Sequence, residues 1–151
     1  MQPLCDEYFK TIEGPVSVAA LNGCVRAYLA AVREYLLVHH DAGIASLAVM
    51  NEYAELVDRL IRKLFRIAED RYFVDFPRLN FRLAVVAVGG YGRGELSLGS
   101  DIDLLFLHRG KLNPYVETIA ETLIQRLWDA RLTVGGATRN HVELEAQRDG
   151  G

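Results

Sequence analysis

Two stretches in the first half of the chain repeat apolar residues at intervals of three and four. They span residues 18–36 and 47–68, and Ser17, a residue type that often caps a helix, directly precedes the first. This spacing places the apolar side chains on one face of a helix. The segment between the two stretches contains Gly43, which suits a helix C-terminus. We therefore expect two amphipathic helices, packed against each other as an antiparallel hairpin.

The pattern changes in the second half of the chain. Residues 71–81 mix aromatic side chains with proline and asparagine, which predicts a connecting loop. Residues 83–88 form a continuous apolar run that ends at Gly89, which predicts a strand buried on both faces. Residues 101–107 predict a second buried strand, with acidic residues at its start. The stretch between the two strands is rich in glycine and polar groups, and we expect it to carry irregular backbone.

The C-terminal third of the chain returns to a helical pattern. Apolar residues over 116–128 follow an asparagine and a proline, residues 132–134 predict a short third strand, and residues 141–148 predict a last helix. The predicted fold class is α/β: an N-terminal helical hairpin, residues 1–70, precedes a core with a small mixed β-sheet, residues 71–151.

Composition narrows the possible functions. Of the 151 residues, 50% are hydrophobic and 25% are charged, which is typical of a globular domain. The net charge of −3 offers no basic excess for nucleic acid or an anionic membrane, so neither is an expected partner. No apolar run approaches the roughly 20 residues of a membrane span, and the N-terminus does not resemble a signal peptide. We expect a cytoplasmic protein whose function resides in a local site.

The most informative chemistry is a pair of carboxylates that follows a pair of glycines. Asp101 and Asp103 are two residues apart at the start of a strand, so their side chains point to one face. Two carboxylates on one face repel each other and need a compensating cation. Mg²⁺, or Mn²⁺, suits them because such ions combine a few carboxylates with substrate phosphates. Gly89 and Gly90 end the preceding strand, ten residues before the pair.

The glycine-rich segment supplies further candidates for phosphate binding. Glycines let the backbone approach an anion closely, and we expect a positive φ at Gly90. Arg93 suits either of two roles, which are neutralising phosphate charge and bracing the loop through Glu95. Ser100 likewise suits either a hydrogen bond to a phosphate or a cap on the following strand. Together with the carboxylates, these residues predict nucleotidyl transfer by metal-assisted displacement.

Two segments carry a resemblance to a known family. Residues 89–96, Gly-Gly-Tyr-Gly-Arg-Gly-Glu-Leu, and residues 100–105, Ser-Asp-Ile-Asp-Leu-Leu, are similar to the catalytic domain of the PII-protein uridylyltransferase family. The glycine pair followed by Asp101 and Asp103 also resembles the wider nucleotidyltransferase superfamily of the DNA polymerase β type. The resemblance is highly specific only over residues 88–107.

The resemblance implies an activity and a role for each site residue. A uridylyltransferase of this type transfers UMP from UTP to a tyrosine of a PII-type nitrogen-signalling protein and releases pyrophosphate. Asp101 and Asp103 would then be the catalytic metal ligands, and Gly89 and Gly90 would pack against the β- and γ-phosphates. Arg93 and Ser100 complete the expected nucleotide-binding set.

The sequence departs from that family in one respect that matters for catalysis. The superfamily usually adds a third carboxylate from a later strand, but residues 132–139 contain no acid. Glu143, Glu145 and Asp149 follow, and nothing in the sequence chooses among them.

Full-length family members are much larger, so we expect a core that is truncated at its C-terminus. Two alternatives stay open: another transferase of the same fold, such as a protein adenylyltransferase or a minimal stand-alone enzyme, and a catalytically silent fragment that binds nucleotide or a partner.

Overall fold

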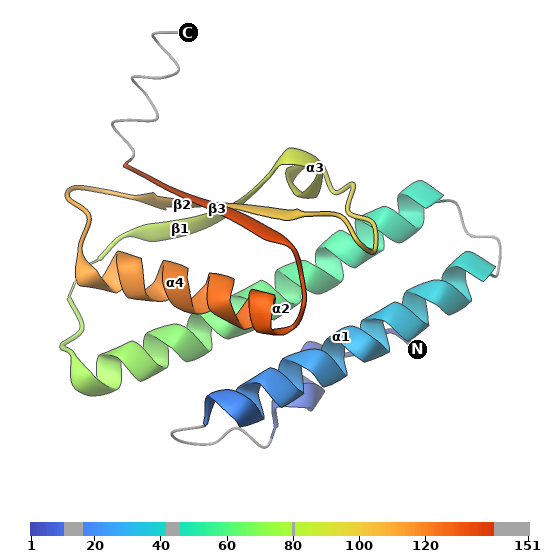
Figure 1. Ribbon diagram of the computed structural model, residues 1–151, viewed down its shortest axis with the longest axis horizontal. Helices are drawn as coiled ribbons and strands as arrows, with labels where there is room; N and C mark the ends of the chain where they lie inside the picture. The colour runs from blue at the N-terminus through green and yellow to red at the C-terminus, as the bar shows by residue number, and fades with distance from the viewer. Residues whose placement is uncertain (11–16, 42–45, 80, 141–151) are drawn as a thin grey trace, which may run out of the picture.

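A computed structural model describes residues 1–10, 17–41, 46–79 and 81–140 of the chain. The expected helix over residues 141–148 and the expected helix end at Gly43 lie outside the described residues. Figure 1 shows the elements in chain order: η1 (Cys5–Phe9), α1 (Val18–Asp41), α2 (Ser46–Asp75), β1 (Leu83–Val88), α3 (Gly89–Gly92), β2 (Ile102–His108), α4 (Pro114–Asp129) and β3 (Val134–Asn140).

The two long helices α1 and α2 run antiparallel along each other, as the apolar spacing predicted (Figure 1). Ser17 caps α1, because its Oγ accepts a hydrogen bond of 3.1 Å from the backbone N–H of Ala20. The side chains at the predicted apolar positions form the shared core of the hairpin, where Val25, Leu36 and Leu60 are almost completely buried. No helix in the described part of the chain combines the length and apolar character needed to cross a bilayer.

The second helix is longer than its sequence pattern predicted. We expected a loop over residues 71–81, but α2 continues to Asp75, so this prediction was wrong for its first five positions. The last turns of α2 present aromatic rings to α4: the rings of Tyr72 and Phe73 lie 5.4 and 5.6 Å from the ring of Tyr115. Burial of these rings against α4 stabilises helical turns that local sequence alone does not favour.

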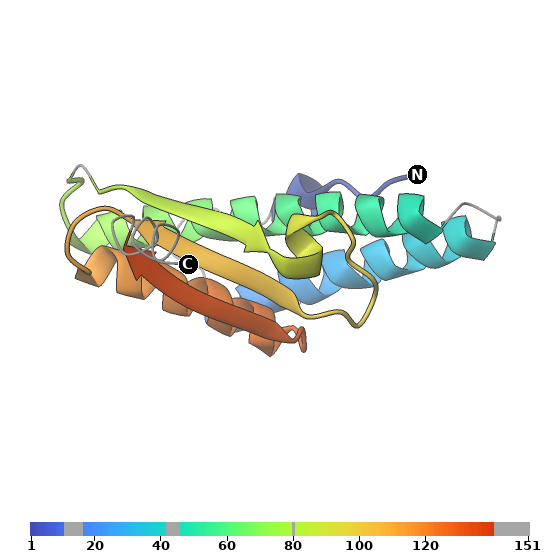
Figure 2. The ribbon, with the colours of Figure 1, turned by 90° about the horizontal axis from the view of Figure 1, so that it is seen from above.

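The three strands form one mixed sheet in the order β1-β2-β3, which confirms the expected α/β class (Figure 2). β1 pairs with β2 in antiparallel fashion, whereas β2 and β3 are parallel and are joined through α4. β3 spans Val134–Asn140, so it begins where the predicted strand over residues 132–134 ends. Glycines and polar residues along β3 give it a weak local preference for a strand. Its pairing with the whole length of β2 stabilises the strand instead.

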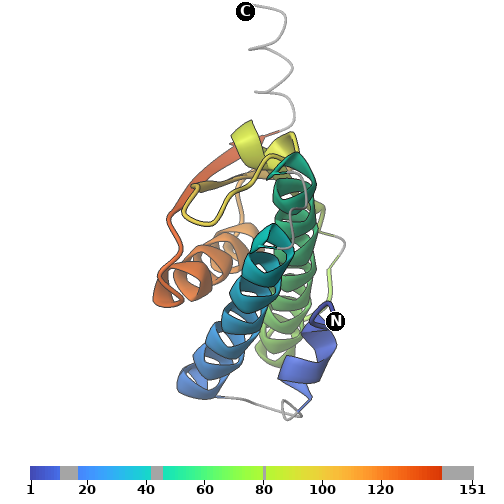
Figure 3. The same ribbon diagram turned by 90° about the vertical axis from the view of Figure 1, so that its right-hand side faces the viewer.

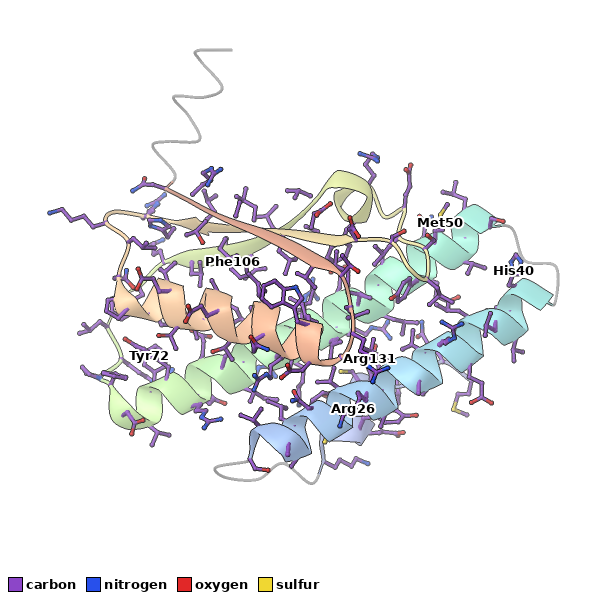
Figure 4. All side chains as sticks on the ribbon, in the orientation of Figure 1. Arg26, His40, Met50, Tyr72, Phe106 and Arg131 are labelled. Carbon is purple, nitrogen blue, oxygen red and sulfur yellow. The ribbon has the colours of Figure 1, made fainter. Side chains whose placement is uncertain are left out.

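All described helices except the short α3 lie on one face of the sheet (Figure 3). Phe106 of β2 is fully buried between the sheet and the helices (Figure 4). β1 is an edge strand, and Ala84 and Val86 on its other face are exposed. The prediction that β1 is buried on both faces was therefore wrong, because no described element covers the second face. We call this second face the open face of the sheet.

The helical hairpin offers a test of local helix stability at Gly23. This residue lies in α1, and a Cβ atom added there would meet no atom within 4 Å. Glycine in a helix interior costs roughly 0.5–1 kcal/mol relative to alanine, because its backbone loses more conformational freedom on folding. We expect Gly23→Ala to raise the free energy of unfolding by about that amount in a denaturant titration. A lower unfolding free energy would show that α1 packs differently around this position.

Candidate active site

Asp103 lies on β2, the central strand of the sheet. Its neighbours across the sheet are Val88 on β1 and Gly135 on β3. Side chains alternate along a strand, and the residues on either side of Asp103, Ile102 and Leu104, are buried against the helices. Asp103 therefore belongs to the open face, where it is half-buried. Asp101 is exposed and lies just before the first residue of β2.

Two glycines flank the carboxylate of Asp103. A Cβ atom at Gly89 would lie 3.0 Å from Oδ2 of Asp103, and a Cβ atom at Gly135 would lie 2.8 Å from its Oδ1. Both distances are too short for ordinary contacts, so each position accommodates the carboxylate only because it carries no side chain. The sequence analysis assigned no role to Gly135. A signal that could have revealed its role is the position of a glycine within a strand, which often marks a close approach of another group.

The glycine turn between β1 and β2 forms the single-turn helix α3. Gly89 has a positive φ of 62°, a conformation that favours glycine. Gly90 does not, so the expected positive φ was assigned to the wrong glycine. At Gly92 a Cβ atom would lie 2.7 Å from the backbone oxygen of Ala87. The turn thus folds back closely onto the end of β1, and it starts directly beside Asp103.

Arg93 and Ser100 both make contacts inside the loop that joins β1 and β2. The Nε of Arg93 donates a hydrogen bond of 3.3 Å to Oε2 of Glu95, and both side chains are largely exposed. The Oγ of Ser100 accepts a hydrogen bond of 3.1 Å from the backbone N–H of Ser97 and lies 2.6 Å from the Oγ of that residue. The contact of Arg93 with Glu95 is the bracing alternative that the sequence left open, whereas Ser100 bonds to Ser97 within the loop. The phosphate-binding roles of Arg93 and Ser100 stay predictions, as does the strand cap at Ser100.

The part of the chain that carries this arrangement matches a known protein family. The family model described as "Putative nucleotidyltransferase DUF294" matches residues 30–136, which is more than half of the chain and includes the glycine turn and both aspartates. The chain belongs to this nucleotidyltransferase family. The resemblance noted over residues 88–107 is confirmed at the level of the family.

The nucleotidyltransferase is also similar to two much longer bacterial proteins. A bifunctional uridylyltransferase/uridylyl-removing enzyme of Rhodospirillum rubrum is 39% identical over 137 residues, which cover 88% of this chain and 14% of that protein. The protein of the same name from Cereibacter sphaeroides is 44% identical over 87 residues, which cover 57% of this chain and 9% of that protein. The chain therefore spans about one seventh of the length of the first relative. No solved structure matches the chain.

The carboxylates of the nucleotidyltransferase suit a divalent cation. Neither the side chain of Asp101 nor that of Asp103 has a hydrogen-bond or ion-pair partner among the described residues. The same part of the chain contains no group of three or more histidine, cysteine or acidic side chains placed so that they could hold a metal ion. A pair of carboxylates without a cationic partner fits Mg²⁺, which prefers oxygen ligands and usually completes its coordination shell with water and substrate phosphates.

Proposed function

We propose that this nucleotidyltransferase binds UTP with Mg²⁺, or Mn²⁺, on the open face of its sheet and transfers UMP to a tyrosine of a PII-type signalling protein. The observation that carries the proposal is the Asp103 carboxylate, which lies on the open face between Gly89 and Gly135. The names of the two relatives support uridylyl transfer. A cytoplasmic location and a role in nitrogen regulation follow from the resemblance and belong to the same proposal.

Each site residue has a stated part in this reaction. Asp101 and Asp103 hold the metal ion, which supplies charge neutralisation on the nucleotide phosphates. Gly89 and Gly90 leave room for the β- and γ-phosphates beside the carboxylates, and the guanidinium of Arg93 adds positive charge near Gly90. The tyrosine hydroxyl forms a new bond to the α-phosphorus of UTP, while the bond from that phosphorus to the β-phosphate oxygen breaks. The hydroxyl proton passes to solvent water, and pyrophosphate is released with the electron pair of the broken bond.

A second candidate function is nucleotide binding without transfer. It is favoured by the composition of β3, where the positions that alternate onto the open face are Gly135, Ala137 and Arg139. None of them is a carboxylate that can take the proton from an attacking hydroxyl. Glu143, Glu145 and Asp149 lie outside the described residues, so the third carboxylate has no assignment.

A calorimetric titration tests the proposed metal and nucleotide site. We expect Mg²⁺ to bind weakly to the free protein and more tightly in the presence of UTP, because phosphate oxygens complete its coordination shell. The double variant Asp101→Asn/Asp103→Asn keeps the size of both side chains but removes their charges. We expect it to lose this cooperative binding, and binding as tight as that of the wild type would contradict the metal assignment.

Mass spectrometry of the acceptor separates the candidate functions. We expect the intact mass of a PII-type protein to increase by one UMP group after incubation with the chain, UTP and Mg²⁺. Labelling with AMP from ATP, but not with UMP, would overturn the uridylyl assignment and retain the nucleotidyltransferase family. Tight binding of UTP without any labelling would favour the second candidate function.

A further inference from the structure

We propose that Tyr91 and Asp58 form a positioning pair, which holds the glycine turn α3 against helix α2 and so fixes Gly89 and Gly90 beside Asp103. Tyr91 is the second residue after Gly89 and is 5% exposed. Its hydroxyl donates a hydrogen bond to Oδ1 of Asp58, which lies in the middle of α2. The consequence for nucleotide binding rests on the proposed function.

Tyr91 is the only residue of α3 with a side chain, because the other three are glycines. A four-residue helix does not persist by itself, since nucleating a helical turn is unfavourable. Glycine also loses more conformational freedom on ordering than any other residue. The turn that lies next to Asp103 therefore depends on contacts from outside, and within α3 only Tyr91 can make them through a side chain.

Helix α2 contacts the turn at a second place as well. A Cβ atom at Gly94 would lie 3.3 Å from Oδ1 of Asn51, and Gly94 has a positive φ of 71°. Asn51 and Asp58 are seven residues apart, so they lie on the same face of α2. One face of this helix thus supports both the turn and Gly94, the second residue after it. Removing the hydroxyl of Tyr91 or the carboxylate of Asp58 should therefore weaken the contact between the turn and α2.

The electrostatic environment favours a Tyr91 hydroxyl that stays protonated. Burial raises the pKa of Tyr91 above its ordinary value, and its hydrogen bond to the carboxylate of Asp58 raises the pKa further. The hydroxyl therefore keeps its proton and remains a donor. A partly buried hydrogen bond to a charged acceptor is stronger than one between neutral groups, so it can hold a short segment in place.

The chain provides a matched control for this pair. The hydroxyl of Tyr115 on α4 donates a hydrogen bond of 2.5 Å to Oε2 of Glu69, which also lies on α2, and Tyr115 is 2% exposed. Tyr115→Phe and Tyr91→Phe therefore remove the same type of bond from the same helix. Only Tyr91 belongs to the glycine turn, so only its replacement should change the affinity for nucleotide.

The first experiment compares the two variants in the full 151-residue chain by titration of UTP with Mg²⁺. We expect both variants to lower the melting temperature, because both lose a partly buried hydrogen bond. Tyr91→Phe should also weaken UTP affinity by about tenfold, the effect of one lost hydrogen bond to a charged group. Tyr115→Phe should bind UTP as the wild type does. Unchanged affinity in Tyr91→Phe, or equal losses in both variants, would overturn the proposal.

Variants of the acceptor provide a rescue test. Asp58→Asn retains an oxygen that can accept the Tyr91 hydrogen bond, so we expect it to keep most of the wild-type affinity. Asp58→Leu removes the acceptor and should bind UTP as weakly as Tyr91→Phe. Equal affinities for the two Asp58 variants would contradict a role that acts through this hydrogen bond.

Hydrogen exchange tests the positioning pair independently of nucleotide. The backbone N–H groups of Arg93, Gly94 and Glu95 donate to the carbonyl oxygens of Gly89, Tyr91 and Gly90, respectively. We expect these three amides to exchange faster in Tyr91→Phe but not in Tyr115→Phe. Unchanged exchange would overturn the positioning pair. A wild-type chain that fails to bind UTP while Tyr91→Phe shows faster exchange would contradict the proposed function alone.

Discussion

Asp103→Ala is expected to abolish nucleotidyl transfer and to weaken the binding of UTP with Mg²⁺, while the protein stays folded. Asp103 is the proposed metal ligand on the central strand, where it lies between Gly89 and Gly135. Loss of metal-assisted charge neutralisation costs several kcal/mol of transition-state stabilisation, or about 10³-fold in rate. Acceptor labelling by intact-mass analysis measures the rate, and calorimetry measures the binding.

The stability of the Asp103 variant distinguishes a catalytic role from a structural one. The carboxylate of Asp103 makes no hydrogen bond or ion pair with another described residue, so its removal breaks no such contact of the fold. We expect the melting temperature of Asp103→Ala to equal or slightly exceed that of the wild type. Asp70→Ala is a matched control, because it removes an exposed acid that pairs only with Arg78 on the surface. Similar losses of binding in both variants would contradict the assignment of Asp103.

Gly135→Ala is expected to reduce transfer strongly, although it adds only one methyl group to an exposed position. Its Cβ atom would lie 2.8 Å from Oδ1 of Asp103, so the carboxylate must move by several tenths of an ångström or rotate. Misplacing a reacting group by about 1 Å can cost about 100-fold in rate. We expect a loss that approaches this size in the labelling assay, together with weaker binding of UTP with Mg²⁺.

The neighbouring glycine provides the control for this prediction. Gly136 is the next residue of β3 and faces the helices, where a Cβ atom would meet Cδ1 of Ile124 at 2.5 Å. That atom is the flexible end of a side chain and can move aside. We therefore expect Gly136→Ala and Gly135→Ala, which each add one methyl group to β3, to change the melting temperature by similar amounts. Unlike Gly135→Ala, Gly136→Ala should bind UTP as the wild type does. Equal UTP affinities for the two variants would show that Gly135 does not position Asp103.

The two glycines beside Asp103 define how the site is built. Gly89 begins the glycine turn at the end of β1 and Gly135 lies on the parallel strand β3, so the carboxylate depends on segments on both sides of the central strand. The turn depends in addition on α2 through Tyr91. Three separate parts of the fold therefore determine where one functional side chain lies.

The sequence by itself determined the elements whose signals are local. The apolar spacing of the hairpin, the apolar runs of β1 and β2 and the capping serine at position 17 each act over a few residues, and the structure confirms them. The glycine pair and the two aspartates also form a local pattern. That pattern was enough to indicate the nucleotidyltransferase family, because its chemistry depends on residue types at a fixed spacing.

Only the tertiary structure decided the features that depend on distant partners. The end of α2 is helical because its aromatic rings pack on α4, and β3 is a strand because β2 pairs with it along its length. β1 is half-exposed because it lies at the sheet edge and the described helices cover one face only. The contacts of Asp103 with Gly135 and of Tyr91 with Asp58 join residues that are 32 and 33 positions apart in the chain. Local propensity does not encode such contacts, since they arise only when strand register and helix packing bring the two segments together.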